Sequence, residues 1–231
     1  MRFLLALLLC AATGALAAVP TEITAEYELM HRTLGTIGHV SESYVRTGDT
    51  YAIRSVSRSE GALKIFIDDS IILESSGKVA RSGLVPLAFG QRRANTAKGE
   101  VKATFDWDKG IMLSVQGDSV TSVPLPRDTQ DRISVLYQFM NIAPGHDEVA
   151  MHMSNGRKIE LYTYRLVDEA RLATPAGEFD TLHYTRVTES PKESRLEVWI
   201  AKDRFNFPVR IVFDDPRGVR LEQTLVSLQS R

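Results

Sequence analysis

Side chains capable of catalysis are present in this chain, but none stands in the spacing of a familiar active site. A serine nucleophile is often presented by a Gly-x-Ser-x-Gly turn, and the sequence contains no such turn. His146 and Asp147 would supply a base and an acid, yet adjacent residues point in different directions and no serine is marked out beside them. We therefore expect no serine-hydrolase chemistry.

The histidines do not form a metal-binding motif. Without cysteine, a metal site relies on closely spaced His, Asp and Glu, as in His-Glu-x-x-His. The five histidines of the sequence are scattered along it: His31, His39, His146, His152 and His183. We expect single histidines that are solvated or hydrogen-bonded, and neither a metal nor another cofactor.

Asp106 and Asp108 are the carboxylate pair closest to the pattern that glycoside hydrolysis requires. Their i, i+2 spacing would place both on one face of a strand, with Trp107 on the other. Lys109 and Gly110 follow directly and indicate a turn, so the alternative is a strand end with two solvated aspartates. We favour the turn, and we expect the protein not to be an enzyme.

The amino terminus has the layout of a secretory signal peptide. Arg2 is followed by an apolar run over residues 3–12 and then by small residues that end in Ala17 and Ala18. Cleavage is expected after Ala17 or Ala18, so residues 1–18 are removed. The apolar run is shorter than the roughly 20 residues that a transmembrane helix needs, and we expect a soluble mature protein.

The cysteine content and the charge limit the compartments and the kinds of partner that fit this sequence. Cys10 is the single cysteine and lies within the apolar run, after three leucines, so a lipid-anchored cysteine is not favoured and disulfides are excluded after cleavage. The sequence has 28 basic and 29 acidic residues, with no basic cluster that would suit nucleic acid. These features predict the periplasm of a Gram-negative bacterium, and no nucleic-acid partner.

Most of the chain alternates between apolar and polar residues, which is the pattern of half-buried β-strands. Short turn sequences separate these runs, so the strands are expected to pair antiparallel. Strands are expected at residues 24–30, 38–46, 50–57, 63–75, 87–96, 101–107, 148–153, 158–167, 178–188, 195–201, 209–213 and 219–227. The fold class is therefore mainly β, with two meander halves forming a curved sheet or barrel-like body.

One amphipathic helix is expected between the two halves, over residues 130–141. Ile133, Leu136, Tyr137 and Met140 recur at helical spacing, and Asp128 or Thr129 would cap the start. Its apolar stripe is expected to cover the sheet. The predicted organisation is one β-rich domain over residues 19–231, with lobes at 19–127 and 146–231 joined by the helix and loop at 128–145; one closed barrel and two separate sheets both remain open.

Several segments resemble a family of exported bacterial proteins called domain of unknown function 3108. They run through nearly the whole chain: residues 82–87 (SGLVPL), 103–108 (ATFDWD), 130–138 (QDRISVLYQ), 174–181 (TPAGEFDT), 198–201 (VWIA) and 207–211 (FPVRI). The resemblance implies export and a β body with a central helix, and it carries no established activity.

Two functions from different classes follow from these observations. The first is a binding or carrier module in the cell envelope, in which the sheet and helix enclose a groove for a lipid-like or amphipathic ligand. The second is a structural module that presents a sheet edge to an envelope protein. The residues expected to line the groove are Tyr27, Trp107, Arg132, Leu136, Tyr137, Met140 and Trp199. Arg132 would either pair with an acid on the sheet or meet an anionic ligand.

Overall fold

A computed structural model describes residues 19–60, 70–142 and 146–231. The expected signal peptide, most of the strand expected at 63–75 and the expected helix end at Pro144 and Gly145 lie outside these residues. The strands of the first half are β1 (Glu22–His31), β2 (Gly35–Thr47), β3 (Thr50–Ser59), β4 (Ser70–Ala80), β5 (Gly83–Arg93), β6 (Val101–Asp106), β7 (Ile111–Gln116) and β8 (Ser119–Pro124).

The second half follows a short helical segment. Its strands are β9 (Gln130–Asp131), β10 (Glu148–Ser154), β11 (Ile159–Thr174), β12 (Gly177–Arg186), β13 (Arg195–Ala201), β14 (Phe207–Asp214) and β15 (Arg220–Ser230). Between β9 and β10 lie the α-helix α1 (Ser134–Gln138) and the 3-10 turn η2 (Phe139–Asn141). We call residues 130–141 the helix segment.

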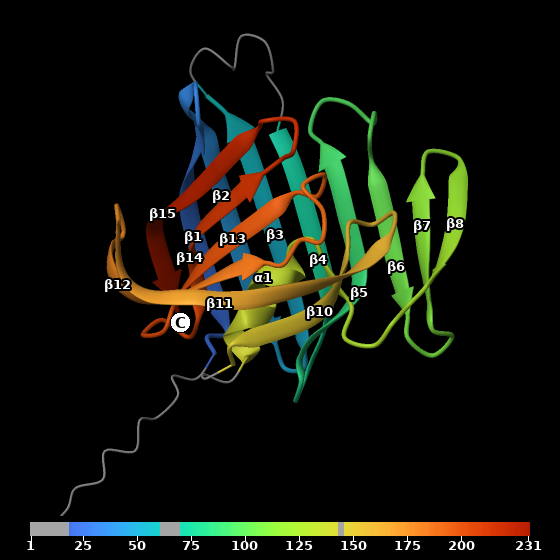
Figure 1. The fold of residues 1–231 in the computed structure, drawn as a ribbon. Helices are drawn as coiled ribbons and strands as arrows, with labels where there is room; N and C mark the ends of the chain where they lie inside the picture. Colours follow the sequence, from blue (N-terminus) through green and yellow to red (C-terminus); the bar gives the residue numbers. More distant parts are fainter. Residues whose placement is uncertain (1–18, 61–69, 143–145) are drawn as a thin grey trace, which may run out of the picture.

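All strands of the described residues belong to one fifteen-stranded sheet, in which β1 and β15 pair at the centre and β8 and β9 form the two ends. Each half is a meander of antiparallel neighbours, and the short β9 pairs parallel with β10. The mainly β fold with one helix is thus confirmed, and a single curved, unclosed sheet replaces both alternatives that the sequence left open. The sheet bends so that strands of the second half cross over the first, with α1 between them (Figure 1).

The helix segment contributes to both apolar cores of the protein. Ile133, Tyr137 and Met140 pack in the larger core, against side chains from the concave face of the first half. Val135 and Phe139 belong to a second core that is built mainly on β10–β14. A helix with apolar residues on opposite sides has to be covered on both sides, and the two halves provide that cover.

The turn between β10 and β11 also reaches across to the first half. Gly156 has φ +83°, which favours glycine, and an added Cβ would lie 2.7 Å from Cγ1 of Val101. The hydroxyl of Ser154 donates to the sulfur of Met112 at 3.1 Å. The two halves therefore close on each other through this turn as well as through the helix segment.

Two predicted features differ from the structure. The helix is shorter than residues 130–141, because β9 occupies its first two positions and η2 its last three. Strands β7 and β8 lie where no strand was predicted. In β7 the buried positions are Met112 and the polar Ser114, so the apolar alternation is broken there.

Candidate functional site

The predicted groove residues fall into three groups. Tyr27, Tyr137 and Met140 are buried in the larger core, with Leu136 half-buried beside them. Trp107 and Trp199 are half-buried and pack against the same core, Trp107 from the turn after β6 and Trp199 from β13. Arg132 is exposed, and its Nη1 donates to Oε1 of Gln91 at 3.1 Å. Arg132 thus meets a neutral amide of β5 rather than a carboxylate.

Asp131 fixes the start of the helix from within the core. Its Oδ1 accepts the backbone N–H groups of Ile133 and Ser134 at 3.0 and 2.9 Å, and its Oδ2 accepts the hydroxyl of Ser75 at 2.5 Å. The Ser75 hydroxyl also lies 3.0 Å from that of Tyr51. The N-cap of α1 is thus Ile133 rather than Asp128 or Thr129, and Asp131 supports the helix start from two residues before it. Burial raises the pKa of Asp131 to about 6, against the lowering effect of these hydrogen bonds.

A second buried carboxylate holds the middle of the helix. Glu42 of β2 lies on the concave face, and its Oε2 accepts the hydroxyl of Tyr137 at 3.0 Å. Burial raises its pKa, while hydrogen bonds from Tyr137 and Ser55 oppose that rise. The aromatic ring of Tyr137 is stacked on Tyr44, with centroids 5.6 Å apart. The helix is thus attached to the sheet by both polar and aromatic contacts.

Two glutamines tie the helix segment to the beginning of β5. Gln138 accepts the Leu84 N–H through Oε1 and donates through Nε2 to the Ser82 carbonyl, both at 2.8 Å. Gln130 donates through Nε2 to the Leu84 carbonyl at 2.7 Å. Through these amide groups the helix segment provides hydrogen-bond partners for backbone groups of Ser82 and Leu84.

A hollow of about 210 Å³ opens beside these glutamines. We call it the Trp107 slot, and it is lined by Ser82, Leu84, Val85, Trp107, Arg127, Asp128, Thr129, Gln130 and Gln138. The indole N–H of Trp107 donates to the Pro86 carbonyl at 2.7 Å, and the ring stacks on Phe105. The aromatic ring is therefore held in a fixed orientation at the slot.

One polar atom in the slot has no protein partner. Gln130 is only 3% exposed, and its Oε1 makes no hydrogen bond within the part of the chain that the structure describes. A buried acceptor without a donor costs about 1–3 kcal/mol. Asp128 lies beside it with φ +62°, a strained conformation for a residue other than glycine. A ligand that donates a hydrogen bond would satisfy Gln130.

Trp199 lies in a separate row of side chains. Its ring stacks on His183 of β12, with centroids 3.9 Å apart, and the guanidinium of Arg210 lies 4.9 Å from its centroid. His183 Nε2 is 3.2 Å from Oε2 of Glu197. All these groups are partnered within the protein, and Trp199 does not line the Trp107 slot.

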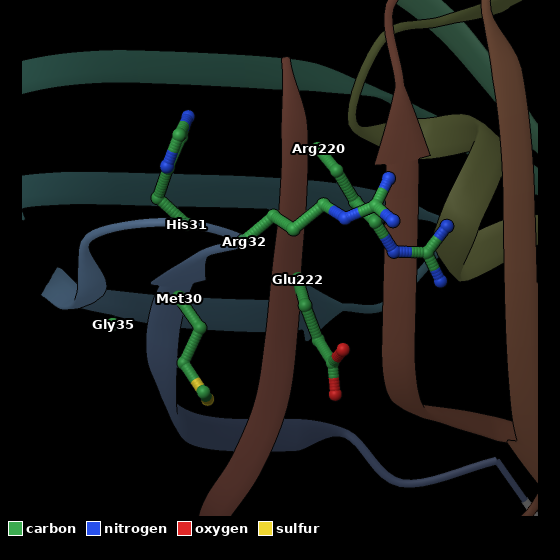
Figure 2. A pocket seen from close by; sticks show the side chains of 6 residues that line it. All are labelled: Met30, His31, Arg32, Gly35, Arg220 and Glu222. Carbon is green, nitrogen blue, oxygen red and sulfur yellow. The ribbon is translucent and has the colours of Figure 1, made fainter. Parts of the chain in front are cut away.

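A second hollow, of about 330 Å³, lies between the β1–β2 turn and β15. It is lined by Met30, His31, Arg32, Gly35, Arg220 and Glu222 (Figure 2).

The described residues contain no group of three or more His, Cys, Asp or Glu side chains that could hold a metal ion. Within the same residues, no helix is long and apolar enough to cross a membrane.

Sequence reasoning missed Glu42 and the two glutamines. Glu42 stands between Val40 and Tyr44 where side chains alternate strictly between the two faces of the strand. Its position on the core-facing side of β2 could therefore have been predicted from the sequence. The roles of Gln130 and Gln138 had no such signal, because their partners are backbone groups of a distant strand.

One large curved, mostly antiparallel sheet around a short helix is the architecture of a class of β-barrel-like proteins. The chain matches the family described as protein of unknown function DUF3108 over residues 26–224, and it belongs to that family. No curated protein matches the sequence.

Solved structures resemble the fold at low sequence identity. A β-barrel-like protein of the DUF1849 domain from Brucella abortus has a TM-score of 0.60 at 12% identity, covering 92% of this chain and 99% of that one. A putative lipoprotein from Parabacteroides distasonis has a TM-score of 0.36 at 11% identity, covering 91% and 96%. A putative outer membrane lipoprotein-sorting protein domain from Vibrio parahaemolyticus has a TM-score of 0.28 at 6% identity, covering 91% and 85%. The Brucella protein supports the barrel-like fold alone.

Proposed function

We propose that the protein is a non-enzymatic binding or carrier module of the bacterial cell envelope, which takes a lipid-like or amphipathic ligand at the Trp107 slot. The observation that carries this proposal concerns Gln130, a residue that lines the slot beside an aromatic ring: its buried Oε1 has no hydrogen-bond donor among the described residues. Native proteins rarely leave such a group unpaired, and a binding site is one of the places where they do.

The slot suits a ligand with apolar and polar parts. Trp107, Leu84 and Val85 offer apolar surface, while Gln130 offers an acceptor and Arg127 a cation. The volume of about 210 Å³ is below the roughly 300–1,000 Å³ of sites that enclose a drug-sized ligand. The slot therefore holds one end of the ligand and leaves the remainder outside.

The core limits how far an acyl chain can enter. Tyr27, Tyr137 and Met140 are packed against other side chains in the larger core. A chain that reaches them has to displace the helix segment, which breaks the contacts of Asp131 and Glu42. Binding at the slot needs no such movement, so the slot is the first contact of the ligand.

The experiment uses the two tryptophans of the sequence. Trp199→Phe leaves Trp107 as the single tryptophan, so that its emission can be excited selectively. This variant is titrated with monomeric lauroyl lysophosphatidylcholine. We expect a saturable change in Trp107 emission. In the same background, Ser82→Tyr, which fills the slot from its exposed rim, should abolish this change in emission. The control Ser230→Tyr, at an exposed position of β15, should leave the change in emission intact.

Native mass spectrometry of protein purified from the periplasm, followed by organic extraction, provides the second readout. A copurifying amphipathic molecule that is absent from the Ser82→Tyr variant supports the slot. An unliganded mass together with an unresponsive Trp107 overturns the proposal.

One observation favours the alternative, a module that binds an envelope protein. Strand β8 pairs with β7 on one side and is the end of the sheet on the other, and its Val120 is 63% exposed. An open edge accepts an added strand from a partner. Crosslinking to a periplasmic protein that is lost in Val120→Lys, and kept in Ser82→Tyr, would favour this alternative.

A further inference from the structure

The hollow between the β1–β2 turn and β15 brings two arginines together. The backbone N–H of Arg32 donates to the carbonyl of Arg220 at 3.2 Å, so the turn is attached to the beginning of β15. Gly35 closes the turn with φ +72°. Both side chains line the hollow, and Figure 2 shows them extending in the same direction.

The charges around this hollow do not balance. Arg220 pairs with Asp214, and Arg210 pairs with Glu222 at 2.8 Å. Arg32 is exposed, and its guanidinium has no carboxylate partner among the residues that the structure describes. Among these three guanidinium groups, Arg32 is thus the one without a carboxylate partner in the described part of the chain.

We propose that this hollow binds a phosphate group between Arg32 and Arg220. A guanidinium is planar and presents paired N–H donors that match two phosphate oxygens. An anion between the two arginines would also relieve their mutual repulsion. The site is separate from the Trp107 slot, since the two hollows share no residue.

Glu222 does not block this site. Its carboxylate is neutralised by Arg210 and points away from the two guanidinium groups (Figure 2). Met30, which is 38% exposed, forms an apolar border. Phosphate groups come both from small soluble anions and from phospholipid headgroups, and the apolar border is compatible with either source.

The test compares Arg32→Gln with Arg217→Gln. Both variants remove one positive charge from this end of the protein, but the exposed Arg217 is already paired with Asp215 and does not line the hollow. Calorimetric titration with inorganic phosphate, at about 20 mM ionic strength so that screening is weak, measures binding. We expect Arg32→Gln to weaken binding by about tenfold or more, and Arg217→Gln by less than about twofold.

Vesicle sedimentation distinguishes the two sources of phosphate. Retention on phosphatidylglycerol vesicles but not on phosphatidylcholine vesicles, lost in Arg32→Gln, assigns the site to a lipid headgroup. Phosphate binding without vesicle binding assigns it to a soluble anion. The proposal is overturned if neither ligand binds, or if both arginine variants weaken binding equally. Ser82→Tyr should leave both readouts unchanged, so failure of the slot and failure of this site are distinguishable.

Discussion

The hydroxyl of Tyr137 donates a hydrogen bond to Glu42 at 3.0 Å, and this contact joins the helix segment to β2, next to the central strand β1. Both side chains are buried, and no Lys or Arg is paired with Glu42 among the described residues. A buried carboxylate depends on its hydrogen-bond donors for stability. The helix is therefore positioned by a polar contact inside an apolar core.

Removing the Tyr137 hydroxyl should destabilise the fold. Tyr137→Phe leaves Glu42 with one donor fewer, and we expect the free energy of unfolding at pH 7 to fall by about 1–3 kcal/mol. Urea denaturation followed by circular dichroism measures this. Tyr164→Phe is the matched control, because the buried Tyr164 hydroxyl has no hydrogen-bond partner among the described residues. Equal losses in the two variants would contradict the assigned role of Glu42.

The protein should become more stable as the pH falls from 7 to 5. The pKa of Asp131 is raised by burial to about 6 in the folded state, above the usual 3.8, so folding favours its protonated form. Its stabilising contribution is fully present below the unfolded-state pKa and is lost as the pH rises through about 6. From these pKa values, Asp131 alone accounts for about 1 kcal/mol between pH 7 and 5.

Glu42 acts in the same direction, since burial raises its pKa too. Asp131→Asn keeps an acceptor for the Ile133 and Ser134 N–H groups while removing the titration. We expect its stability to vary less with pH than that of the wild type, with the share of Glu42 remaining. Urea midpoints at pH 5, 6 and 7 test this expectation, and a wild-type midpoint that falls on acidification would refute it.

Loss of the Gln138 side chain should lower the free energy of unfolding more than loss of the exposed Gln116 side chain. It makes two hydrogen bonds to backbone groups beside β5, and Gln138→Leu leaves both groups without that partner, costing about 1–3 kcal/mol. Gln116 accepts a single bond from Arg157 at an exposed position, so Gln116→Leu should cost under about 1 kcal/mol. Thermal unfolding of the two variants provides the comparison.

Gly156 should be more sensitive to substitution than Gly117, another turn glycine. Gly156→Ala combines a left-handed backbone with a Cβ 2.7 Å from Val101 and 3.1 Å from Phe89, and we expect a loss of about 2–4 kcal/mol. Gly117 also has a positive φ, but an added Cβ there meets nothing within 4 Å. Gly117→Ala should cost about 1–2 kcal/mol, from the backbone alone. Similar losses would mean that the β10–β11 turn does not pack firmly on the first half.

The meander could be predicted because most strands alternate apolar and polar residues between turn sequences. The pattern fails in β7, where Ser114 takes a buried position, and in β8, where Val120 is exposed. The helix was expected to be longer, because residues 130 and 131 fit helical spacing equally well. Their pairing with Met153 and Ser154 depends on a distant strand, which the local pattern does not contain.

The candidate site was less predictable than the fold. Of the expected groove residues, Trp107 lines the Trp107 slot, while Tyr27, Tyr137 and Met140 are packed in the core. The residue type of an aromatic side chain does not show whether it packs in the core or binds a ligand, because it suits both roles. The slot itself depends on where Gln130, Gln138 and the start of β5 meet, which is set by tertiary structure.

The pairing of β1 with β15 joins the first and the last strand of the sheet. The Thr21 N–H donates to the Arg231 carbonyl at 2.8 Å, across nearly the full length of the sequence. Until β15 has left the ribosome, β1 and β14 each have an unpaired edge in the middle of the sheet. Such edges are prone to wrong pairing. Because β15 fills the gap between β1 and β14, the synthesis of this last strand decides when the sheet can be completed.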